Sequence, residues 1–413
     1  MSLTDAPGVN IVGAGLAGSL LAILLAKRGF KVTVYERRPD PRTTPVIGGR
    51  SINLALAARG IRGLRLAGVL EHVMRFAIPM RGRMVHEFDG AAALQPYGVR
   101  PEEVIYSVGR ADLNRTLIDT AAELPNVELR FGQACLGLVH DRPLLEMRDE
   151  ATGRIYHAAA QPCIATDGAG SEVRDALVER EIAMVREEPL AHDYKELTIP
   201  ARDGQPVLDV NALHIWPRGG FMLIALPNPD GAFTATLFLS RSGPNSFEQL
   251  NSAPAVQDFF AREFPGARAL IPELAREFFE RPQGGLGTVY TKGWHLNGDV
   301  LLLGDAAHAI VPFHGQGMNC AFEDCAELDR LMDQHHGWAG LFEAFENARR
   351  PNTDAIAQMA LDNYVEMRET VLDPEYRKNK REEEDLARRD PNFISRYAKV
   401  MFHPEIPYSQ VQW

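Results

Sequence analysis

The chain has 413 residues, of which 45% are hydrophobic and 24% charged, an ordinary composition for a globular protein with two or three lobes around sizeable cores. Its formal net charge of −11 disfavours nucleic acid as a partner, because an acidic protein repels a phosphate backbone. The four cysteines form no CxxC pair or zinc-like cluster, so no metal is expected, and no run of 18 apolar residues predicts a membrane span.

A nucleotide-binding βαβ unit is predicted at the start of the chain. Residues 9–12 are expected to form a buried strand, residues 16–28 an apolar helix closed by Gly29, and residues 31–35 a second strand. Glu36 ends this strand, where an acid can accept a hydrogen bond from a ribose hydroxyl. The glycines of the first turn allow backbone to approach a diphosphate at the helix N-terminus. They are Gly13, Gly15 and Gly18.

Two further motifs follow. Residues 163–174 come after a strand-like segment and open a helix, but Val173 stands where a third glycine would complete a second dinucleotide fingerprint. No other segment predicts a separate nicotinamide-binding unit. The last motif, residues 303–319, contains Gly304, Asp305 and the turn Gly315–Gly317.

The middle of the chain changes character between residues 181 and 284. Strands are predicted over 213–217, 221–227 and 233–239, with a hairpin turn at 228–231. After about residue 330 the pattern is helical to the end. The charged stretch 377–389 is expected to be the solvated face of a helix, because it contains i,i+4 pairs of opposite charge.

In this order, the three motifs resemble those of the single-component FAD-dependent aromatic hydroxylases, the class A flavin monooxygenases. The resemblance covers nearly the whole chain and is closest to the members that hydroxylate L-kynurenine. It implies bound FAD, NADPH as co-substrate, and oxygen transfer from dioxygen through a flavin hydroperoxide to give 3-hydroxykynurenine. The segments that carry it are 49–56, 78–84, 213–218, 322–325 and 363–368.

The chain departs from the family pattern at its end. Eukaryotic members carry a C-terminal membrane anchor, whereas this sequence stops at Trp413, so a soluble, bacterial-type, cytoplasmic enzyme is expected. The implied fold is α/β: a Rossmann-like FAD-binding domain with an inserted β-sheet substrate domain and a C-terminal helical region. The expected boundaries are 1–75, 102–180 and 285–330 for FAD, 76–101 and 181–284 for substrate, and 331–413 for the helices.

The resemblance also implies the cofactor-binding residues. The adenosine end should meet residues near Glu36, Ala55 should lie near the isoalloxazine ring, and Asp305 should accept from a ribityl hydroxyl, although Asp305 could also cap the following helix. Met318 and Asn319 should present backbone N–H groups to the pyrimidine edge of the flavin. The full set is Gly13, Gly15, Ala17, Gly18, Glu36, Arg38, Ala55, Arg110, Cys135, Asp167, Asp305, Gly317, Met318 and Asn319.

For the substrate, the resemblance assigns the α-carboxylate to Arg83 and Tyr97, although composition alone would favour a surface arginine. Glu366 could brace Arg83 or meet the substrate ammonium. Ile224 and Phe238 share one side of a predicted sheet and could line a slot for the ring or belong to a core. The other expected contacts are Asn363, Met367, Tyr397, Phe313 and His314.

No catalytic acid or base is assigned, because the amino group of the substrate itself activates the neighbouring ring carbon. His308 and His314 are expected to pack rather than to transfer protons. NADPH should visit the flavin transiently. Three alternatives stay open: a sibling hydroxylase of another aromatic acid, a non-catalytic FAD-binding protein, and a nicotinamide dehydrogenase without flavin. The sequence leaves the oligomeric state open, with a homodimer among the alternatives.

Overall fold

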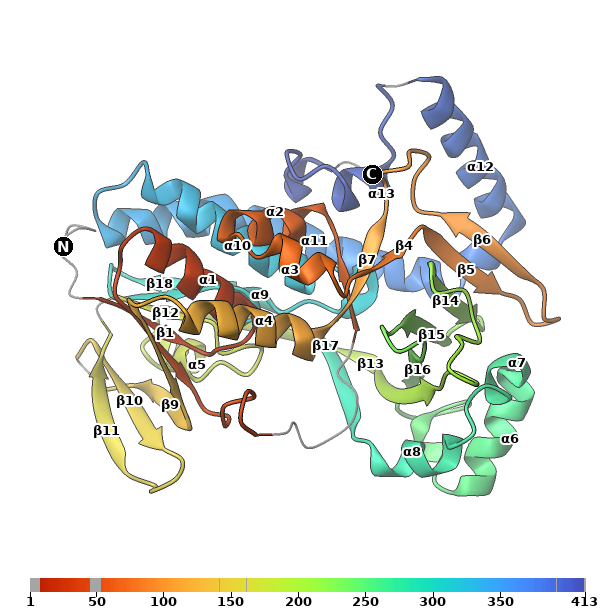
Figure 1. Ribbon diagram of the computed structural model, residues 1–413, viewed down its shortest axis with the longest axis horizontal. Coiled ribbons are helices and arrows are strands. Elements are labelled where there is room, and N and C mark those ends of the chain that lie inside the picture. Colours follow the sequence, from red (N-terminus) through yellow and green to blue (C-terminus); the bar gives the residue numbers. More distant parts are fainter. Residues whose placement is uncertain (1–7, 45–52, 141, 161, 391, 412–413) are drawn as a thin grey trace.

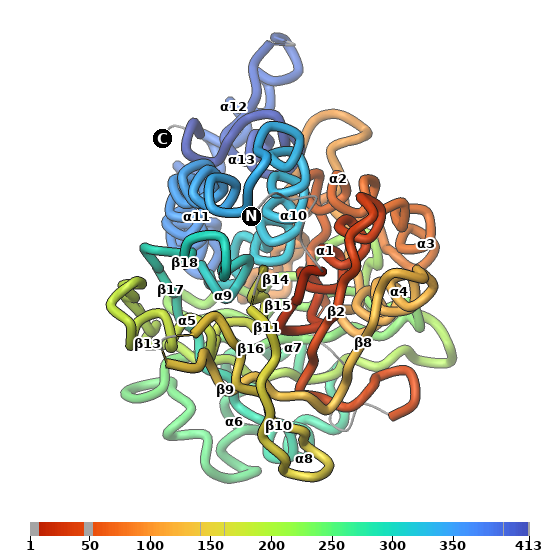
Figure 2. The backbone as a smooth tube through the Cα atoms, turned by 90° about the vertical axis from the view of Figure 1, so that its left-hand side faces the viewer, coloured from red at the N-terminus to blue at the C-terminus, as the bar shows by residue number. Residues whose placement is uncertain are grey.

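A computed structural model describes residues 8–44, 53–140, 142–160, 162–390 and 392–411 (Figure 1). Segment 49–52, part of the family resemblance, lies outside these residues. In the described part, no helix combines the length and the apolar character that a membrane crossing needs. Two large sheets organise the fold, and helices from the C-terminal third of the chain lie across both (Figures 1 and 2).

The first large sheet contains the predicted βαβ unit and is parallel apart from one edge strand. Helix α1 (Leu16–Lys27) is buried along most of its length between the sheet and other helices, which is why its sequence is apolar all round. Arg28 is the C-cap residue and Gly29 follows with φ +89°, so the helix ends at the glycine, as the sequence predicts. In spatial order the strands are β18 (His295–Leu296), β19 (Val300–Leu302), β12 (Cys163–Ala165), β1 (Val9–Val12), β2 (Val32–Glu36) and β8 (Val127–Phe131).

The second large sheet has seven strands and two apolar faces. Alternate residues of one strand point to opposite faces, so Met222 and Leu226 join the core on the inner side while Leu223 and Ala225 join the core on the outer side. The outer face is covered by α6 (Ala253–Glu263), α7 (Pro265–Arg268) and α8 (Leu274–Glu280). In order the strands are β17 (Gln283–Lys292), β13 (Met184–Ile199), β16 (Phe233–Ser240), β15 (Met222–Pro227), β14 (Ala212–Pro217), β5 (Gly82–His86) and β6 (Ala92–Pro96).

Two small sheets complete the β structure. One comprises β3 (Asn53–Leu56), β7 (Ile105–Gly109) and β4 (Ile78–Met80), and the other β9 (Gln133–Leu138), β10 (Leu144–Asp149) and β11 (Ile155–Ala159). The helices in this part of the sequence are α2 (Ala58–Ala67), α3 (Leu70–Met74), α4 (Arg110–Ala122) and α5 (Glu172–Glu179). The chain passes between the large sheets several times, and the domain boundaries drawn from the sequence stay a proposal.

The C-terminal third is helical, as predicted. Helix α11 (Trp338–Arg368) contributes Trp338 and Phe345 to the core of the first sheet and Met359 to the inner core of the second, so one helix links both cores. Helix α12 (Pro374–Arg389) has no buried residue and projects from the molecule (Figure 1). The remaining elements are α9 (Asp305–His308), α10 (Gly317–Met332), α12 (Pro374–Arg389), α13 (Arg396–Met401) and the 3-10 turns η2 (Phe247–Gln249), η3 (Pro312–His314), η4 (Thr370–Leu372) and η5 (Tyr408–Gln410).

Candidate active site

The glycine turn between β1 and α1 is packed on one side and open on the other. Gly13 has φ +100°, and a Cβ there would lie 2.6 Å from the carbonyl oxygen of Thr166. A Cβ on Gly18 would lie 1.9 Å from the carbonyl oxygen of Gly13, whereas one on Gly15 would meet nothing within 4 Å. Helix α1 has neither a side-chain cap nor an acidic residue in its first turn, and the described residues offer no hydrogen-bond partner to the N–H groups of Leu16, Ala17 and Gly18. This cradle fits a diphosphate.

Glu36 lies at the carboxyl end of β2, beside this cradle. Its buried carboxylate accepts hydrogen bonds from the backbone N–H groups of Ala14 and Arg38, both at 2.9 Å. Burial raises the pKa of Glu36, but the guanidinium of Arg38 and the two N–H groups outweigh it, so the pKa is lowered. The carboxylate is therefore ionised, as an acceptor for ribose hydroxyls must be. Arg38 is exposed and covers its outer side.

Cys135 and Asp167 lie in β9 and after β12. Cys135 is partly buried, and burial raises the pKa of its thiol to about 12, so the thiol has no nucleophilic role. Asp167 follows the strand that packs against the glycine turn, and one of its carboxylate oxygens has no hydrogen-bond partner in the described structure. Ala17 stands in the first turn of α1, where its carbonyl oxygen is 3.4 Å from the thiol of Cys325.

Asp305 opens α9 directly after Gly304, whose φ is +65°. Its side chain is reached by solvent, yet burial by the surrounding protein raises its pKa, against the opposing charges of His308 and Arg110. Arg110 lies close enough for its charge to act on this carboxyl group. The capping alternative is not met, because Gly304 is the N-cap residue and no side chain caps α9.

Asn319 joins the loop before α10 to β3. Its side-chain amide donates to the carbonyl oxygens of Ala55 (2.8 Å) and Gly315 (2.7 Å) and accepts from the N–H of Ala57 (2.9 Å). No side chain caps α10, and the described residues offer no hydrogen-bond partner to the N–H groups of Gly317, Met318 and Asn319, at the positive end of a 16-residue helix. This geometry suits a partly anionic ring edge beside Ala55.

The second part of the site is a cavity of about 340 Å³ between β5, β6 and α12. Arg83 points into it from β5 and is only 7% exposed, so it is not a surface arginine. Its guanidinium donates to Glu366 Oε1 (2.9 Å) and Asn363 Oδ1 (3.2 Å). The rings of Tyr97 and Tyr397 stack 5.4 Å apart, with their centroids 5.9 and 5.3 Å from the guanidinium carbon.

The protonation states in this cavity follow from burial and from Arg83. Burial raises the pKa of Tyr97 to about 12 and that of Tyr397 well above its ordinary value, so both hydroxyls keep their protons. Burial also raises the pKa of Glu366, but Arg83 and the Tyr376 hydroxyl outweigh it and the pKa is lowered. Glu366 is thus an anion that braces Arg83, the first of the two roles left open.

An apolar wall, none of whose residues line the cavity itself, packs beside this polar end through Asn363. Phe313 stacks on Tyr364, with ring centroids 3.8 Å apart, and meets Phe238 edge to face at 4.9 Å. The Asn363 amide donates to the Phe313 carbonyl oxygen (2.6 Å) and the Met367 sulfur (3.3 Å). Ile224 packs against the same core. The structure therefore brings together the predicted substrate residues from four separate parts of the chain.

The two histidines differ in their surroundings. His314 stacks on Tyr397 at 5.6 Å, and burial lowers its pKa to about 4, so it is neutral near pH 7. His308 is buried away from the cavity, where its Nε2 lies 2.5 Å from Asp324. Asp324 also accepts from the Gly304 N–H and from Arg349, so it supports the loop that carries Asp305. His308, Cys320 and Asp324 could hold a cation by spacing alone, but Arg349 already neutralises this carboxylate.

Helix α12 supplies residues that sequence reasoning did not assign to the site. Tyr376 hydrogen-bonds to Glu366, and one side of the helix lines the cavity through Arg377, Lys380 and Arg381. The helix is solvated, as predicted, and the Lys378–Glu382 pair forms at 3.7 Å. Its sequence resembles an ordinary charged surface helix, so nothing in the local pattern indicated that it covers a cavity.

A family model described as "FAD binding domain" matches residues 7–360. A curated relative named kynurenine 3-monooxygenase, from Myxococcus xanthus, is 48% identical over 402 residues, which cover 97% of this chain and 86% of the relative. A relative of the same name from Stenotrophomonas maltophilia is 47% identical over 409 residues, covering 97% and 88%. The solved tetrameric form of 2-methyl-3-hydroxypyridine-5-carboxylic acid oxygenase has a TM-score of 0.72 at 19% identity, covering 97% and 98%, and shares the fold.

Proposed function

The chain belongs to the kynurenine 3-monooxygenase family of FAD-binding monooxygenases, and from this membership we propose that it converts L-kynurenine, NADPH, a proton and dioxygen into 3-hydroxykynurenine, NADP⁺ and water. The observation that carries the substrate assignment is Arg83, a buried cation in a cavity that also contains two protonated tyrosine hydroxyls. This is a receptor for the carboxylate of an amino acid.

Arg83 can bind that carboxylate without losing its present partners. A guanidinium has five N–H donors, and the hydrogen bonds to Glu366 and Asn363 use two of them. Tyr97 and Tyr397 can donate further hydrogen bonds from either side. Charge-assisted hydrogen bonds of this kind contribute roughly 1.5–3 kcal/mol. Because Glu366 already neutralises Arg83 in the free protein, the pair is held in place before substrate arrives.

The aromatic ring of the substrate would lie against the apolar wall formed by Phe313, Phe238, Met367 and Ile224. The anilino nitrogen donates electron density to the ring carbon beside it, so that carbon needs no base on the protein. His314 is neutral near pH 7, which agrees with a reaction in which the substrate nitrogen, and no base on the protein, activates the ring carbon. The chain supplies orientation and excludes water, which would favour wasteful release of peroxide.

FAD, when bound, accepts a hydride from NADPH and activates dioxygen. We propose that the glycine turn and the α1 N-terminus hold its diphosphate, Glu36 its adenosine ribose, and Asp305 its ribityl chain. The unpaired N–H groups at the start of α10 would stabilise negative charge on the reduced ring. NADPH would approach this ring transiently, since we find no nicotinamide-binding unit in the sequence.

The test follows NADPH oxidation by the purified yellow protein with and without L-kynurenine, together with the mass of the product. Faster NADPH oxidation and a product heavier by one oxygen atom would support the proposal. Faster oxidation with peroxide as the only product would make kynurenine an effector, and a panel of aromatic acids would then be screened for a sibling activity. A colourless protein that reduces no flavin would contradict the FAD assignment itself.

A further inference from the structure

The last described segment of the chain, residues 402–411, packs against the loop that precedes α10. Tyr408 is fully buried, and its hydroxyl donates a hydrogen bond of 2.7 Å to Oε1 of Gln316, which is also fully buried. The amide nitrogen of Gln316 lies 3.0 Å from the sulfur of Met401. The side chain between Gly315 and Gly317 is therefore held by residues from the other end of the chain.

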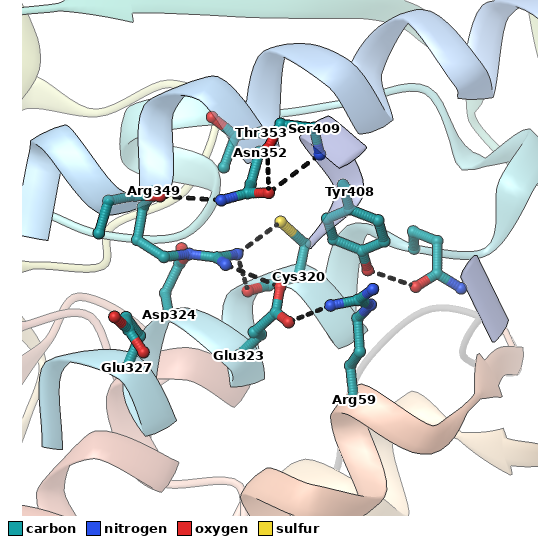
Figure 3. Close-up of polar contacts among 12 residues, drawn as sticks. Arg59, Cys320, Glu323, Asp324, Glu327, Arg349, Asn352, Thr353, Tyr408 and Ser409 are labelled. Atoms are coloured by element: carbon teal, nitrogen blue, oxygen red, sulfur yellow. Dashed lines mark hydrogen bonds and ion pairs between the residues drawn. The ribbon is translucent and has the colours of Figure 1, made fainter. Parts of the chain in front are cut away.

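A buried ionic network holds Tyr408 in this position (Figure 3). The guanidinium of Arg59 lies 3.7 Å from the centroid of the Tyr408 ring, forms an ion pair with Glu323, and donates to the carbonyl oxygen of Ile406 at 2.5 Å. Arg349 bridges Glu323 (2.7 Å) and Asp324 (2.6 Å). A buried guanidinium requires such partners, so the terminal segment completes the surroundings of Arg59.

Residues of α11 anchor the same segment from the other side. Ser409 donates its N–H and its hydroxyl to Oδ1 of Asn352, both at 3.0 Å (Figure 3). Arg59 of α2 and Asn352 of α11 therefore contact the terminal segment directly, and Glu323 of α10 holds Arg59 in place.

The loop that Tyr408 contacts is the one whose direction matters for the proposed flavin site. Gly315 has φ +64°, a conformation that glycine adopts without strain but does not itself maintain. Asn319 fixes the loop toward Ala55, and Gln316 fixes it toward the C-terminus. Gln316 is the N-cap residue of α10, yet its side chain does not cap the helix. It accepts a hydrogen bond from Tyr408 and donates to the sulfur of Met401 instead.

We propose that Tyr408 is a positioning residue for the flavin ring, which acts through Gln316 on the direction of the N–H groups that open α10. The role rests on the proposed function, since it takes the start of α10 as the site of the pyrimidine edge. Tyr408 reaches no reacting atom. It determines how firmly the loop holds its donors, and hence how well reduction of the ring is coupled to oxygen transfer.

The test compares Tyr408→Phe with a matched control. The substitution keeps the ring over Arg59 and removes one hydroxyl, which leaves Oε1 of Gln316 buried without a donor. Tyr156→Phe is the control. The hydroxyl of Tyr156, on β11, also donates to a glutamine, at 2.8 Å to Oε1 of Gln133 on β9, and both residues belong to a small sheet outside the Tyr408 cluster. Gln316→Met removes the other partner, and the double variant Tyr408→Phe/Gln316→Met shows whether the two side chains act as one unit.

Three quantities are measured on the FAD-bound protein: hydrogen exchange of peptides covering 311–322, the visible flavin spectrum, and the fraction of consumed NADPH that appears as peroxide. For Tyr408→Phe we expect exchange about five- to tenfold faster in that segment. We also expect a shifted flavin band and a larger peroxide fraction, with effects in the double variant no larger than in either single one. Tyr156→Phe should behave as wild type.

The proposal fails if Tyr408→Phe exchanges and absorbs like wild type, or if Tyr156→Phe changes these readouts equally. Additive effects of Tyr408→Phe and Gln316→Met would also contradict it. Exchange and spectrum are recorded without kynurenine, so they decide the role of Tyr408 even if another aromatic acid proves to be the substrate. Should Tyr408→Phe fold poorly, Ser409→Ala, which loosens the same segment at Asn352, should reproduce the faster exchange in weaker form.

Discussion

At the scale of single residues, the proposed substrate site contains Arg83, a cation that is buried in the free protein. Burial opposes the charge of Arg83, but Tyr397 and Glu366 outweigh it and its pKa is raised, so the guanidinium stays protonated at any accessible pH. Such a group is costly to bury and is retained where an anion must be recognised. The partner that offsets this cost in the free protein is Glu366, at 2.9 Å.

Replacing Arg83 by alanine should therefore weaken kynurenine binding while FAD stays bound. Loss of charge-assisted hydrogen bonds worth roughly 1.5–3 kcal/mol predicts an increase in KM of about ten- to hundredfold. Arg81→Ala is the matched control, because Arg81 is exposed and does not line the cavity. Steady-state kinetics and the flavin content per chain are measured together. Unchanged KM in Arg83→Ala would remove this residue from the site.

A pair of histidines on the outer side of the second sheet predicts a pH dependence of stability. The His86 Nε2 lies 2.8 Å from the His214 Nδ1, and the His86 ring stacks on Trp216 at 4.2 Å. Burial, His214 and Arg218 together lower the pKa of His86 from 6.5 to about 4. The unfolded chain therefore binds more protons than the native one between these values, so stability falls as pH decreases from 6.5 toward 4.

His86→Gln should accordingly lose less stability than wild type between pH 7 and pH 5, because glutamine does not titrate. The measurement is the urea midpoint of unfolding at both pH values. His157→Gln, a change at an exposed histidine on β11, should keep the wild-type difference. If His86→Gln shows the full wild-type decrease, the acid sensitivity arises elsewhere, with His192 and His214, whose pKa values are also lowered, as the next candidates.

At the scale of elements, the local signals were reliable where neighbours in sequence are neighbours in space. The βαβ unit from Val9 to Glu36 follows from periodicity and from Gly13 and Gly29, and the hairpin turn at Asn228–Gly231 follows from its turn residues. The environment of Tyr408 did not follow, because Arg59 reaches Ile406 across 347 positions in sequence. No local pattern can indicate a contact of that separation.

Helix α12 shows the same limit and gives a prediction. It has no buried residue and is joined to the second sheet through Arg377, whose guanidinium lies 2.7 Å from Glu87. Arg377→Gln should speed tryptic cleavage within α12 by about two- to fivefold, since a solvent-accessible ion pair contributes roughly 0.2–1 kcal/mol. Arg388→Gln is the control, because the ion pairs of Arg388 within the described part of the chain are with Glu384 and Asp385 of its own helix. Equal cleavage rates would show that the Arg377–Glu87 pair does not anchor the helix.

At the scale of the whole molecule, α10 and α11 connect the parts that the two large sheets keep separate (Figure 1). Helix α11 is 31 residues long, about 46 Å at 1.5 Å per residue, and it reaches from the core of the first sheet to the inner core of the second. At its middle, Arg349 neutralises Glu323 and Asp324 of α10. This buried ionic centre reaches the terminal segment through Arg59 and the turn at Gly304 through Asp324.

Arg349→Met is the prediction that belongs to this scale. It leaves two buried carboxylates short of a partner, so the free energy of unfolding should fall by roughly 3–5 kcal/mol, and FAD should bind more weakly because Asp324 supports the Asp305 loop. The neighbouring Arg350→Met should change stability by less than about 1 kcal/mol, because Arg350 is only partly buried and its ion pair with Glu346 is 3.6 Å long.

Both variants are unfolded in urea and followed by tryptophan fluorescence and by far-ultraviolet circular dichroism. Because α11 enters both cores, the two signals should shift together in Arg349→Met, with FAD release at the same urea concentration. A variant in which flavin is lost well before the circular dichroism changes would show that the proposed flavin site opens independently of global unfolding. The ionic centre would then stabilise the first sheet and its helices without linking them to the substrate cavity.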